Sequence, residues 1–533
     1  MSATRLRFYA LKRFGWLKLF ASAFVALGLF GCYGGGGDSS GSNAEIAFYD
    51  TNLSLLEKDI VRDRSAINLS VYSAKYGVDN WYKGGEVTPI SKTSEYWLQG
   101  DTNFYADANV TEIRTESDLK DVNASCGSLN KYIVLNDIAL KSKWDSLCDD
   151  SAKKFMGTLS GNGYAITELW IDGEGDSHVG LFKTIGNYGA VKNLAVKTAI
   201  GKEINGSSYY SGAIAAINDG LIENVSFEGA ISGVSNTGGI AGNNNGVISG
   251  AIFKGDVSGS DHTGGIAGVN DGKISLSGFE GNVKGGDYAG GIAGRVENGD
   301  INDSYSKGEI IGGNNTGGIV GYFLEGRVKN VYSAARIKGV NHVGGIAGYA
   351  YNHGDDNSEI NNSYSIGNVI GEGNFTGGIA GFAVGDFGNG FLLIANSYSE
   401  GNIGGDYKVG GIVGGASGHW IKISNNAAIN AKITATGDAN RIIGHKDALA
   451  PAERIFNNFA LDSMNVSALG ANGVEGDSTT QANFELNATY LKSESDGGLG
   501  WRFGGNDANP WVWGAFGDYK YPTLYWQEKS PKQ

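Results

Sequence analysis

Short apolar segments alternate with turns rich in Gly and Asn through most of this 533-residue chain. In the segment that begins at Gly238, GGIAGNNNGVISGAIFKGDVSG, apolar and β-branched residues occupy alternate positions, as they do in a strand that buries one face. No stretch between these segments keeps a helical period over enough residues to form a helix. The pattern therefore predicts an all-β protein built from short strands.

A Gly-Gly-Ile-(Ala/Val)-Gly block sets the period of this pattern. A period near 26 residues suits one coil of a solenoid with two or three short strands, and stacked coils pair equivalent strands in parallel sheets. We therefore expect a right-handed parallel β-helix of roughly ten coils, about 50 Å long at ~4.8 Å per coil, with a cap at each end. The clear copies are 26, 26, 27, 27, 33 and 33 residues apart and begin at Gly238, Gly264, Gly290, Gly317, Gly344, Gly377 and Gly410, with weaker copies at Val179, Gly212 and Asn440.

Composition supports a solenoid over other glycine-rich architectures. The chain has 87 glycines and 5 prolines but no three-residue period, which excludes collagen, and its hydrophobic fraction of 41% is too high for simple disorder. No proline lies between Pro89 and Pro451. This is expected if nearly every strand is central in a sheet, because proline cannot donate to the hydrogen-bond ladder.

Each repeat carries one aromatic residue after its Asn-rich turn. We expect these rings to form a single stack in the core; an external aromatic row that binds sugar is the alternative. The turn asparagines are expected to form side-chain ladders, because Asn tolerates the left-handed conformation. The aromatic residues are Phe227, Phe253, Phe279, Tyr305, Tyr332, Tyr364 and Tyr398, and the asparagines are Asn218, Asn244, Asn270 and Asn298.

The ten tryptophans are distributed unevenly, with none between Trp170 and Trp420 and four close to the C-terminal end. We interpret this cluster as a cap over the last coil, since a solenoid must cover its open ends. A sugar-binding platform is the alternative. The cluster comprises Trp501, Phe503, Trp511, Trp513, Tyr521, Pro522, Tyr525 and Trp526.

The first residues have the pattern of an export signal followed by a lipid-attachment site. Leu19–Phe30 is an uncharged apolar run after a basic segment, and Leu29-Phe30-Gly31-Cys32 resembles the lipobox of bacterial lipoproteins. We expect a signal peptide over residues 1–31, acylation of Cys32 and a flexible tether over residues 32–43. The protein would then be exported and held by lipid at the outer membrane or cell surface. A secretory signal with an unmodified Cys32 is the alternative.

Export also bears on the two other cysteines. In an oxidising compartment we expect Cys126 and Cys148 to form a disulfide, whereas two buried free thiols are the alternative.

The formal net charge of −14 disfavours nucleic acid as a partner. Four lysines at similar positions in their repeats are more consistent with a solvated face than with a basic binding row: Lys254, Lys284, Lys307 and Lys338.

Insertions at residues 349–361 and 383–396 lengthen two repeats, and insertions of this kind often form a working face. The first contains oxygen-bearing side chains that could bind calcium, although their spacing is not that of an EF-hand, so we favour a solvated acidic loop. None of the six histidines belongs to HExxH, and no GxSxG elbow occurs. We therefore predict no catalytic residues and no cofactor. The calcium candidates are Asp355, Asp356, Asn357 and Glu359.

The repeats resemble the GLUG-motif repeat of bacterial surface and secreted proteins, over about residues 179–445. Residues 109–178, with KYIVLNDIAL and FMGTLSGNGYAITEL, resemble the lead-in coils of such proteins, and residues 446–533 resemble their terminal coil with a Trp-rich cap. Residues 44–108 remain unassigned. The resemblance implies a β-helical protein at the cell surface.

Together these features predict a non-enzymatic, adhesin-like lipoprotein that binds a glycan, a matrix or a cell-surface partner through the faces of its β-helix. The membrane would be a second partner, through the lipid. One alternative is a polysaccharide-degrading or polysaccharide-binding β-helix, whose acidic residues would be placed by the fold rather than by sequence spacing. The other is a structural spacer with no specific ligand.

Overall fold

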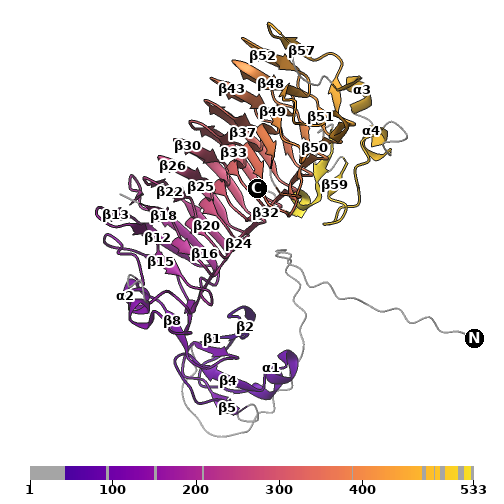
Figure 1. The fold of residues 1–533 in the computed structure, drawn as a ribbon. Helices are drawn as coiled ribbons and strands as arrows, with labels where there is room; N and C mark the ends of the chain where they lie inside the picture. The colour runs from indigo at the N-terminus through magenta and orange to yellow at the C-terminus, as the bar shows by residue number, and fades with distance from the viewer. Residues whose placement is uncertain are drawn as a thin grey trace, which may run out of the picture.

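The protein is a right-handed parallel β-helix, as predicted, but with about 12 turns where roughly ten were expected, and it has a small unit at its N-terminal end (Figure 1). The computed structural model describes residues 43–529 apart from 92–94, 149–152, 207–208, 387, 471–475, 485–486, 493–497 and 514–520. The predicted signal peptide, Cys32 and the tether up to residue 42 lie outside the described residues. Within the described part of the chain, no helix is long and apolar enough to cross a membrane.

The N-terminal unit is a five-stranded sheet with one helix. Its strand order is β2-β1-β7-β4-β5, and β1 is antiparallel to β2 but parallel to β7. Phe48 packs against Trp81 and Phe104 in a core on one face of the sheet. The elements are β1 (Asn43–Tyr49), β2 (Leu55–Arg62), β3 (Ala66–Asn68), α1 (Leu69–Tyr76), β4 (Asn80–Lys83), β5 (Ile90–Ser91), β6 (Glu95–Trp97) and β7 (Thr102–Tyr105).

The other face of this sheet covers the first coil of the solenoid. Tyr49 and Tyr105 stack with their ring centroids 5.2 Å apart and share a buried cluster with Val110 and Ile133 of that coil. The segment that the sequence leaves unassigned therefore supplies the cap expected at the N-terminal end.

Each full coil contributes strands to three parallel sheets, which we call the long sheet and flank sheets 1 and 2. The flank sheets contain the two halves of the Gly-Gly-Ile block, and each has ten strands. Flank sheet 1 comprises β14 (His178–Val179), β18 (Tyr210–Gly212), β22 (Asn236–Gly238), β26 (Asp261–Gly264), β30 (Asp287–Gly290), β34 (Thr316–Gly317), β38 (Val343–Gly344), β43 (Asn374–Gly377), β48 (Tyr407–Gly410) and β53 (Ala439–Asn440). Flank sheet 2 comprises β15 (Phe182–Ile185), β19 (Ala215–Asn218), β23 (Ala241–Asn244), β27 (Ala267–Asn270), β31 (Ala293–Val296), β35 (Val320–Phe323), β39 (Ala347–Asn352), β44 (Ala380–Gly385), β49 (Val413–Ser417) and β54 (Ile443–Lys446).

The long sheet runs the whole length of the solenoid, and α2 (Glu116–Asp121) and η1 (Val122–Ser125) lie between its first two strands. Its strands are β8 (Val110–Ile113), β9 (Lys131–Val134), β10 (Ile138–Ala139), β11 (Thr158–Ser160), β12 (Ala165–Leu169), β13 (Ile171–Gly173), β16 (Ala190–Thr198), β17 (Ile204–Gly206), β20 (Leu221–Glu228), β21 (Ile231–Ser232), β24 (Val247–Ser249), β25 (Ile252–Ser258), β28 (Lys273–Ser275), β29 (Gly278–Lys284), β32 (Asp300–Asn302), β33 (Tyr305–Ile311), β36 (Arg327–Lys329), β37 (Tyr332–Gly339), β40 (Ser358–Asn361), β41 (Tyr364–Ser365), β42 (Val369–Gly371), β45 (Leu392–Ala395), β46 (Tyr398–Ser399), β47 (Ile403–Gly405), β50 (Ile421–Ser424), β51 (Ala427–Ala428), β52 (Lys432–Ala435), β55 (Ile455–Phe456), β56 (Phe459–Leu461), β57 (Asn465–Ser467) and β58 (Asp477–Thr479).

The long sheet bends at one left-handed residue in each of ten successive coils. Asn fills seven of these positions, because its short amide side chain tolerates positive φ and can hydrogen-bond to the next coil. Asn457, for example, donates its side-chain N–H to Asn425 Oδ1 (2.7 Å). The ten residues have φ between 50° and 68° and are Asn193, Asn224, Gly250, Leu276, Asp303, Asn330, Asn362, Asn396, Asn425 and Asn457.

The predicted ladder of turn asparagines is present but shorter than expected. The side-chain amide of Asn218 donates to Asn244 Oδ1 (2.7 Å), and that of Asn244 donates to Asn270 Oδ1 (2.6 Å), all three being fully buried. Asn298 is exposed and lies outside the ladder, since Val296 takes the position in register with Asn270. The reason is that the turn before Gly299 is one residue longer than in the preceding repeats.

The aromatic residues predicted as one row form two rows on opposite faces of the long sheet. Phe253 pairs in register with Phe279, and both are fully buried in the core. Phe279 pairs with Ser306, however, so Tyr305 takes the neighbouring position, which points to the other face. The inner row continues through buried serines, whereas the outer row consists of Tyr305, Tyr332, Tyr364 and Tyr398.

The change of face follows from turn length. The aromatic residue lies seven positions after the turn glycine in the Phe repeats, as from Gly272 to Phe279. It lies six positions after it in the Tyr repeats, as from Gly299 to Tyr305. Because successive side chains in a strand point to opposite faces, this one-residue difference moves the ring from the inside to the outside. The prediction of a single core stack is therefore wrong for the four tyrosines.

The C-terminal segment runs back along the side of the solenoid, as the yellow ribbon in Figure 1 shows. We call residues 498–529, as far as the structure describes them, the strap. Its three buried tryptophans contact the tyrosine row from one end to the other, Trp501 and Trp511 at Tyr398, and Trp526 at Tyr332 and Tyr305. Beyond the last long-sheet strands the elements are η2 (Ala452–Arg454), α3 (Gln481–Phe484), α4 (Asn487–Leu491), β59 (Trp511–Val512), β60 (Thr523–Leu524) and η4 (Tyr525–Lys529).

The tryptophan cluster thus covers a lateral face, and this corrects the prediction that it caps the last coil. The Trp526 indole N–H donates to the Asn330 carbonyl (2.8 Å), and the Tyr398 hydroxyl donates to the Pro522 carbonyl (3.1 Å). The strap tryptophans pack on the outer tyrosines because these would otherwise form a large exposed apolar surface. At the end of the solenoid, β58 pairs with β56.

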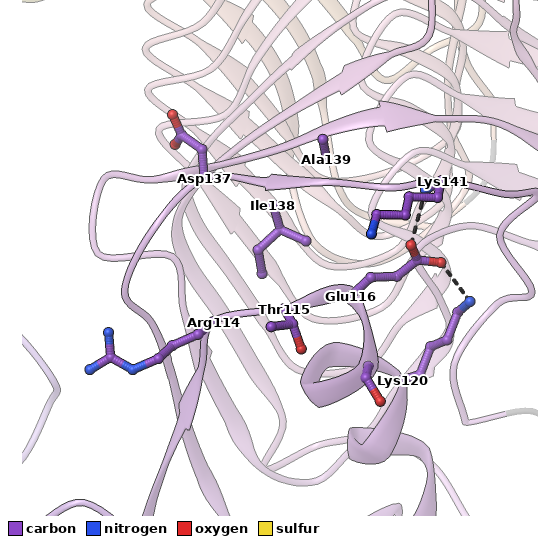
Figure 2. A pocket seen from close by; sticks show the side chains of 9 residues that line it. Arg114, Thr115, Glu116, Lys120, Asp137, Ile138, Ala139 and Lys141 are labelled. Carbon is purple, nitrogen blue, oxygen red and sulfur yellow. Dashed lines mark hydrogen bonds and ion pairs between the residues drawn. The ribbon is translucent and has the colours of Figure 1, made fainter.

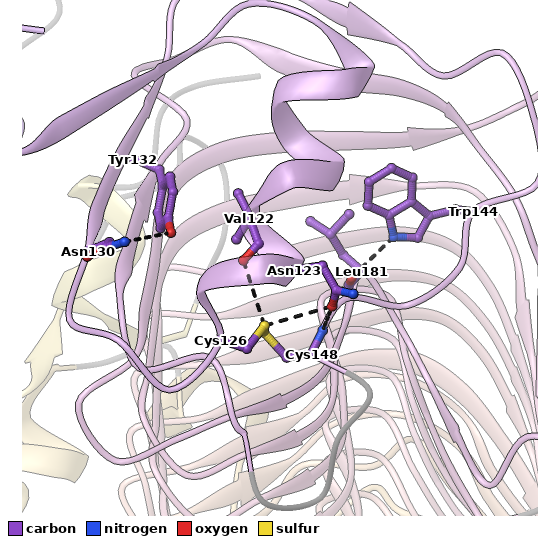
Figure 3. Close-up of a disulfide and its surroundings, with 8 residues drawn as sticks. All are labelled: Val122, Asn123, Cys126, Asn130, Tyr132, Trp144, Cys148 and Leu181. Carbon is purple, nitrogen blue, oxygen red and sulfur yellow. Dashed lines mark hydrogen bonds between the residues drawn. A yellow bond between two sulfur atoms is a disulfide. The ribbon is translucent and has the colours of Figure 1, made fainter. Parts of the chain in front are cut away.

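A disulfide joins Cys126 to Cys148 near the first coils, with their Cα atoms 5.5 Å apart (Figure 3). It connects the end of η1 to the loop that follows Trp144. The Asn123 side chain supports this loop by accepting the Cys148 backbone N–H (2.7 Å), and the Trp144 indole N–H donates to the Leu181 carbonyl (3.2 Å). These contacts attach the capped N-terminal end to the second coil.

Candidate binding surface

Aromatic side chains from the two flank sheets meet in a continuous cluster along the solenoid. One column comes from flank sheet 1, at the position just before the paired Thr263, Ala289, Val343 and Thr376. The other comes from flank sheet 2, where Arg295, Tyr322, Tyr349 and Phe382 pair in register. We call this cluster the aromatic strip; it comprises His262, Tyr288, Arg295, Tyr322, His342, Tyr349, Phe375 and Phe382.

The rings of the strip contact one another both along a column and between columns. Along flank sheet 2, the Tyr322 and Tyr349 centroids are 5.3 Å apart, and those of Tyr349 and Phe382 are 5.6 Å apart. Between the columns, Tyr288 meets Tyr322 edge-on at 5.6 Å, and Phe375 lies 4.4 Å from Phe382. Ring pairs at these separations stabilise one another beyond the area they bury. The strip is therefore a preorganised surface.

The strip is only partly buried. All eight of its side chains are of intermediate exposure. The hydroxyls of Tyr288, Tyr322 and Tyr349 have no hydrogen-bond partner among the described residues. Tyrosine combines an apolar ring with a polar tip, and this is why it is common in binding surfaces. The strip thus offers apolar surface and free hydroxyls together.

The same column of flank sheet 1 is left-handed in each of six coils, and Asn315 (55°) and Lys408 (61°) share this conformation with the four rings. His262, Tyr288, His342 and Phe375 all have positive φ, of 44°, 60°, 53° and 65°. This conformation is uncommon for bulky side chains, costs of order 1–3 kcal/mol per residue and clusters at functional sites. The fold therefore holds these rings in an unfavourable backbone conformation over four of the six coils from His262 to Lys408.

The two histidines of the strip are neutral near pH 7. Burial lowers the pKa of His342 to about 4, and burial together with the Arg295 charge lowers the pKa of His262. The Nδ1 atom of His342 lies 2.8 Å from Asn315 Oδ1. Burial also raises the pKa of Tyr349 to about 12, so its hydroxyl stays protonated. The titratable groups at the centre of the strip therefore act as hydrogen-bonding groups and not as charges.

A ladder of polar side chains borders the strip on flank sheet 1. The backbone N–H of Asn314 donates to Asp287 Oδ1 (2.8 Å), and the side-chain amide of Asn341 donates to Asn314 Oδ1 (2.9 Å). The backbone N–H of Asn374 in turn donates to Asn341 Oδ1 (2.8 Å). One amide or carboxylate is therefore presented at each coil beside the rings. We call these residues the polar border.

The charges of the strip are paired or covered. Arg295 forms an ion pair with Glu297 and lies 5.8 Å from the centroid of Tyr322. The Lys408 ammonium lies 4.4 Å from the centroid of Phe375. His353, just beyond the strip, pairs with Glu325. The charge of Arg295 is therefore neutralised, whereas the Lys408 ammonium beside the strip lies over a ring and keeps its charge.

Sequence reasoning missed the strip because it considered only one aromatic residue per repeat. A signal is nevertheless present at two fixed offsets from the Gly-Gly-Ile block. The residue two positions before the block is His262, Tyr288, His342 or Phe375, and the residue five positions after its start is Tyr322, Tyr349 or Phe382 in three successive repeats. Only the register between the flank sheets shows that these two positions meet.

The calcium candidates do not converge on a common point. Asp355 Oδ1 accepts the Asn389 backbone N–H (3.2 Å), and Asn357 Oδ1 accepts the Phe391 backbone N–H (2.8 Å). Glu359 forms an ion pair with Lys329, and Asp356 is exposed. In the described part of the chain, no group of three or more His, Cys, Asp or Glu side chains is placed to hold a metal ion. The two insertions stack on each other and extend flank sheet 2.

The four lysines of the predicted solvated face belong to two columns. Lys254 and Lys307 share one column and both pair with Glu280, at 3.3 and 3.5 Å. Lys284 and Lys338 are in another column, separated by Ile311, and Lys338 pairs with Glu372 (2.7 Å). Opposite charges alternate along the first column, and uncharged Ile311 separates the lysines of the second, so no basic row forms.

A shallow pocket of about 500 Å³ lies between α2 and β10 near the N-terminal end (Figure 2). Its central carboxylate, Glu116, pairs with Lys120 (2.6 Å) and accepts the Lys141 backbone N–H (3.0 Å). Thr115 and Asp118 form a capping box at the start of α2. These polar groups bind one another and fasten α2 to the first coil, so we assign the pocket a structural role.

No protein-family model matches the chain. A protein of Evansella cellulosilytica named as a Gly-rich membrane protein is 31% identical over 142 residues, which cover 24% of this chain and 16% of that protein. Halomucin of Haloquadratum walsbyi is 38% identical over 80 residues, 15% of this chain and 1% of halomucin. The chain therefore spans a small fraction of the length of these curated relatives.

Two solved structures align with the chain at low similarity. One is a Bacteroides ovatus protein assigned to the immunoglobulin A1 proteases, at 17% identity and a TM-score of 0.26, covering 78% of this chain and 92% of that one. The other is an IgA1 protease, at 16% identity and a TM-score of 0.27, covering 78% of this chain and 26% of that one. At these scores the alignments carry no inference about activity.

Proposed function

We propose that this chain is an exported, surface-tethered, non-enzymatic binding protein that presents the aromatic strip to a glycan, a matrix or a neighbouring cell, in the manner of an adhesin. The observation that carries the proposal is the strip itself. It combines partly exposed rings, hydroxyls without a partner among the described residues, and positive backbone φ on the flank of the solenoid. Repeats of the GLUG type and acylation of Cys32 are parts of the same proposal.

Two further features support an exported, surface location. The relatives with matching segments are named as a membrane protein and as halomucin. A disulfide between Cys126 and Cys148 is typical of proteins that fold in an oxidising compartment. The lipobox-like segment before Cys32 would tether the solenoid, with residues 33–43 as spacer.

A glycan and matrix array read in parallel with an assay for new reducing ends tests this function. The purified protein is expected to bind at least one surface component and to release no reducing ends. Turnover of any polysaccharide would contradict the non-enzymatic assignment and favour a polysaccharide-degrading β-helix. Absence of binding to every component and to whole cells would favour a spacer.

A further inference from the structure

On flank sheet 1 the strip places a ring in four of six successive coils, with Asn315 and Lys408 at the other two, and this regular spacing restricts the ligand it can bind. Between His262 and Lys408, six successive coils place a side chain at the same position of flank sheet 1. The rings of flank sheet 2 follow at centroid separations of 5.3 and 5.6 Å, close to the ~4.8 Å spacing of neighbouring strands. A ligand that uses all of these positions must itself repeat along its length.

The polar border runs parallel to the rings and sets a second requirement for the ligand, which is that it must form hydrogen bonds along one side. Asn314 and Asn341 present side-chain amides on adjacent coils, and Asn374 is exposed on the next. Amides both donate and accept hydrogen bonds, as do the tyrosine hydroxyls. A polymer whose repeating unit carries C–H groups on its faces and hydroxyls on its edges can pack its faces on the rings and hydrogen-bond its hydroxyls to the polar border. Sugars have this combination.

The charges around the strip favour an uncharged ligand. Arg295 is neutralised by Glu297, and the Lys408 ammonium lies over the Phe375 ring. A carboxylate borders the strip at Asp287, Glu325 lies just beyond it, and the whole chain carries a formal net charge of −14. A polyanion would approach against this field.

We infer that the aromatic strip binds a linear, uncharged polysaccharide that lies parallel to the solenoid axis, with its sugar rings against Tyr322, Tyr349 and Phe382 and its hydroxyls on the polar border. This inference rests on the proposed function and specifies its ligand class. The bound length is set by the six coils, about 24 Å at ~4.8 Å per coil. Affinity should therefore rise with the length of the oligosaccharide until it spans the strip and then level off.

The test uses the full mature chain and soluble linear polysaccharides: a neutral β-glucan, a mannan and a xylan, with alginate and polygalacturonate as acidic probes. Affinity electrophoresis finds the polysaccharide that binds, and calorimetry with its oligosaccharides gives the length dependence. Tyr322→Ala is expected to weaken binding about tenfold, and Asn341→Ala severalfold. Asn341 lies outside the ring packing, so this variant tests the site without disturbing the rings. Tyr188→Ala, which removes an exposed ring elsewhere (74% exposed), is expected to bind like wild type.

The outcomes separate this inference from the proposed function. Binding to a neutral polysaccharide that is insensitive to salt, and weakened by both Tyr322→Ala and Asn341→Ala, supports the inference. Binding only to alginate or polygalacturonate, with a steep dependence on salt, overturns it. Strip-dependent binding to cells without binding to any neutral polysaccharide also overturns it, assigns the strip to a protein partner and leaves the proposed function standing. Binding to cells that neither Tyr322→Ala nor Asn341→Ala affects contradicts both this inference and the proposed function.

Discussion

At the residue scale, the ring of Phe279 shows how each coil fixes the next. It stacks on Phe253 with centroids 5.8 Å apart and lies so close to Gly265 that a Cβ there would be 2.3 Å from the ring. The Phe279 ring therefore leaves no room for a side chain at this position of the Gly-Gly-Ile block. Glycine at position 265 is required by this close approach and not by a turn.

Phe279→Ala is expected to lower the free energy of unfolding by about 3–5 kcal/mol, because the ring is fully buried and its removal leaves a cavity. Urea denaturation followed by circular dichroism measures the change. Tyr188→Ala is the control and should stay within about 0.5 kcal/mol of wild type, since that side chain is exposed. Equal losses in the two variants would contradict the assignment of Phe279 to the core.

His342 gives the strip a pH-dependent stability. Its neighbours are the Asn315 amide and the uncharged rings of Tyr349, Phe375 and Phe382, so no carboxylate among the described residues pairs with an imidazolium there. The unfolded chain takes up a proton at this histidine near pH 6.5, whereas the folded chain does so only near pH 4. Between these values the unfolded state binds more protons, and stability therefore falls as the pH falls.

His342→Gln should remove this part of the pH dependence. The drop in melting temperature between pH 7 and pH 4.5 is expected to be smaller in the variant than in wild type, as measured by differential scanning calorimetry. Carboxylates contribute to the drop in both proteins, so the comparison between them isolates the histidine. An identical drop would show that the imidazole is protonated in the folded protein above pH 4.5.

At the scale of elements, the strap and the outer tyrosines depend on each other. Tyr364 and Tyr398 are 3% and 0% exposed because strap residues cover them. The Gln527 side-chain amide donates to the Tyr364 hydroxyl (2.6 Å). Without the strap, this row would leave a contiguous apolar patch on the outside of the solenoid.

Trp526→Ala is expected to speed amide hydrogen exchange in the coils of Tyr305 and Tyr332, since it removes the ring that covers them. Exchange in the coils around Phe253, which the strap does not contact, should be unchanged. Trp97→Ala is the matched control because that side chain is 64% exposed in the N-terminal unit. Equal exchange rates in wild type and Trp526→Ala in the coils of Tyr305 and Tyr332 would mean that the strap does not stabilise these coils.

The sequence predicts elements well where one period governs them and poorly where register decides. The repeat blocks give the coils and the parallel sheets, because Gly-Gly-Ile recurs at near-constant spacing. The split of the aromatic residues into two rows depends on one extra turn residue before Gly299, whose effect appears only when strands are paired. The strip likewise needs the register between two flank sheets. The N-terminal unit has no repeat, and its residues therefore gave no signal.

At the scale of the whole molecule, the proposed tether would place the N-terminal cap nearest the membrane and project the flank sheets away from it. The first described strand, β1, belongs to this cap, directly after the predicted tether. The solenoid would then extend away from the membrane by about 50 Å or more at ~4.8 Å per coil. Rings on the flank would remain accessible to partners outside the cell.

Metabolic labelling with a fatty acid tests this tether. Wild-type protein is expected to incorporate the label, and Cys32→Ala is expected not to, because the acyl chains need the Cys32 thiol. Cys126→Ala with Cys148→Ala is the control and should be labelled as wild type. Equal labelling of wild type and Cys32→Ala would exclude the anchor at this residue.

The central claim is that the aromatic strip is the surface through which this β-helix binds. Its most direct test compares three purified proteins on the component found by the array: wild type, the double variant Tyr322→Ala with Tyr349→Ala, and Tyr188→Ala. Each is first checked for wild-type circular dichroism. The account predicts that wild type and Tyr188→Ala bind alike while the double variant loses binding by tenfold or more. Equal binding by all three would contradict it.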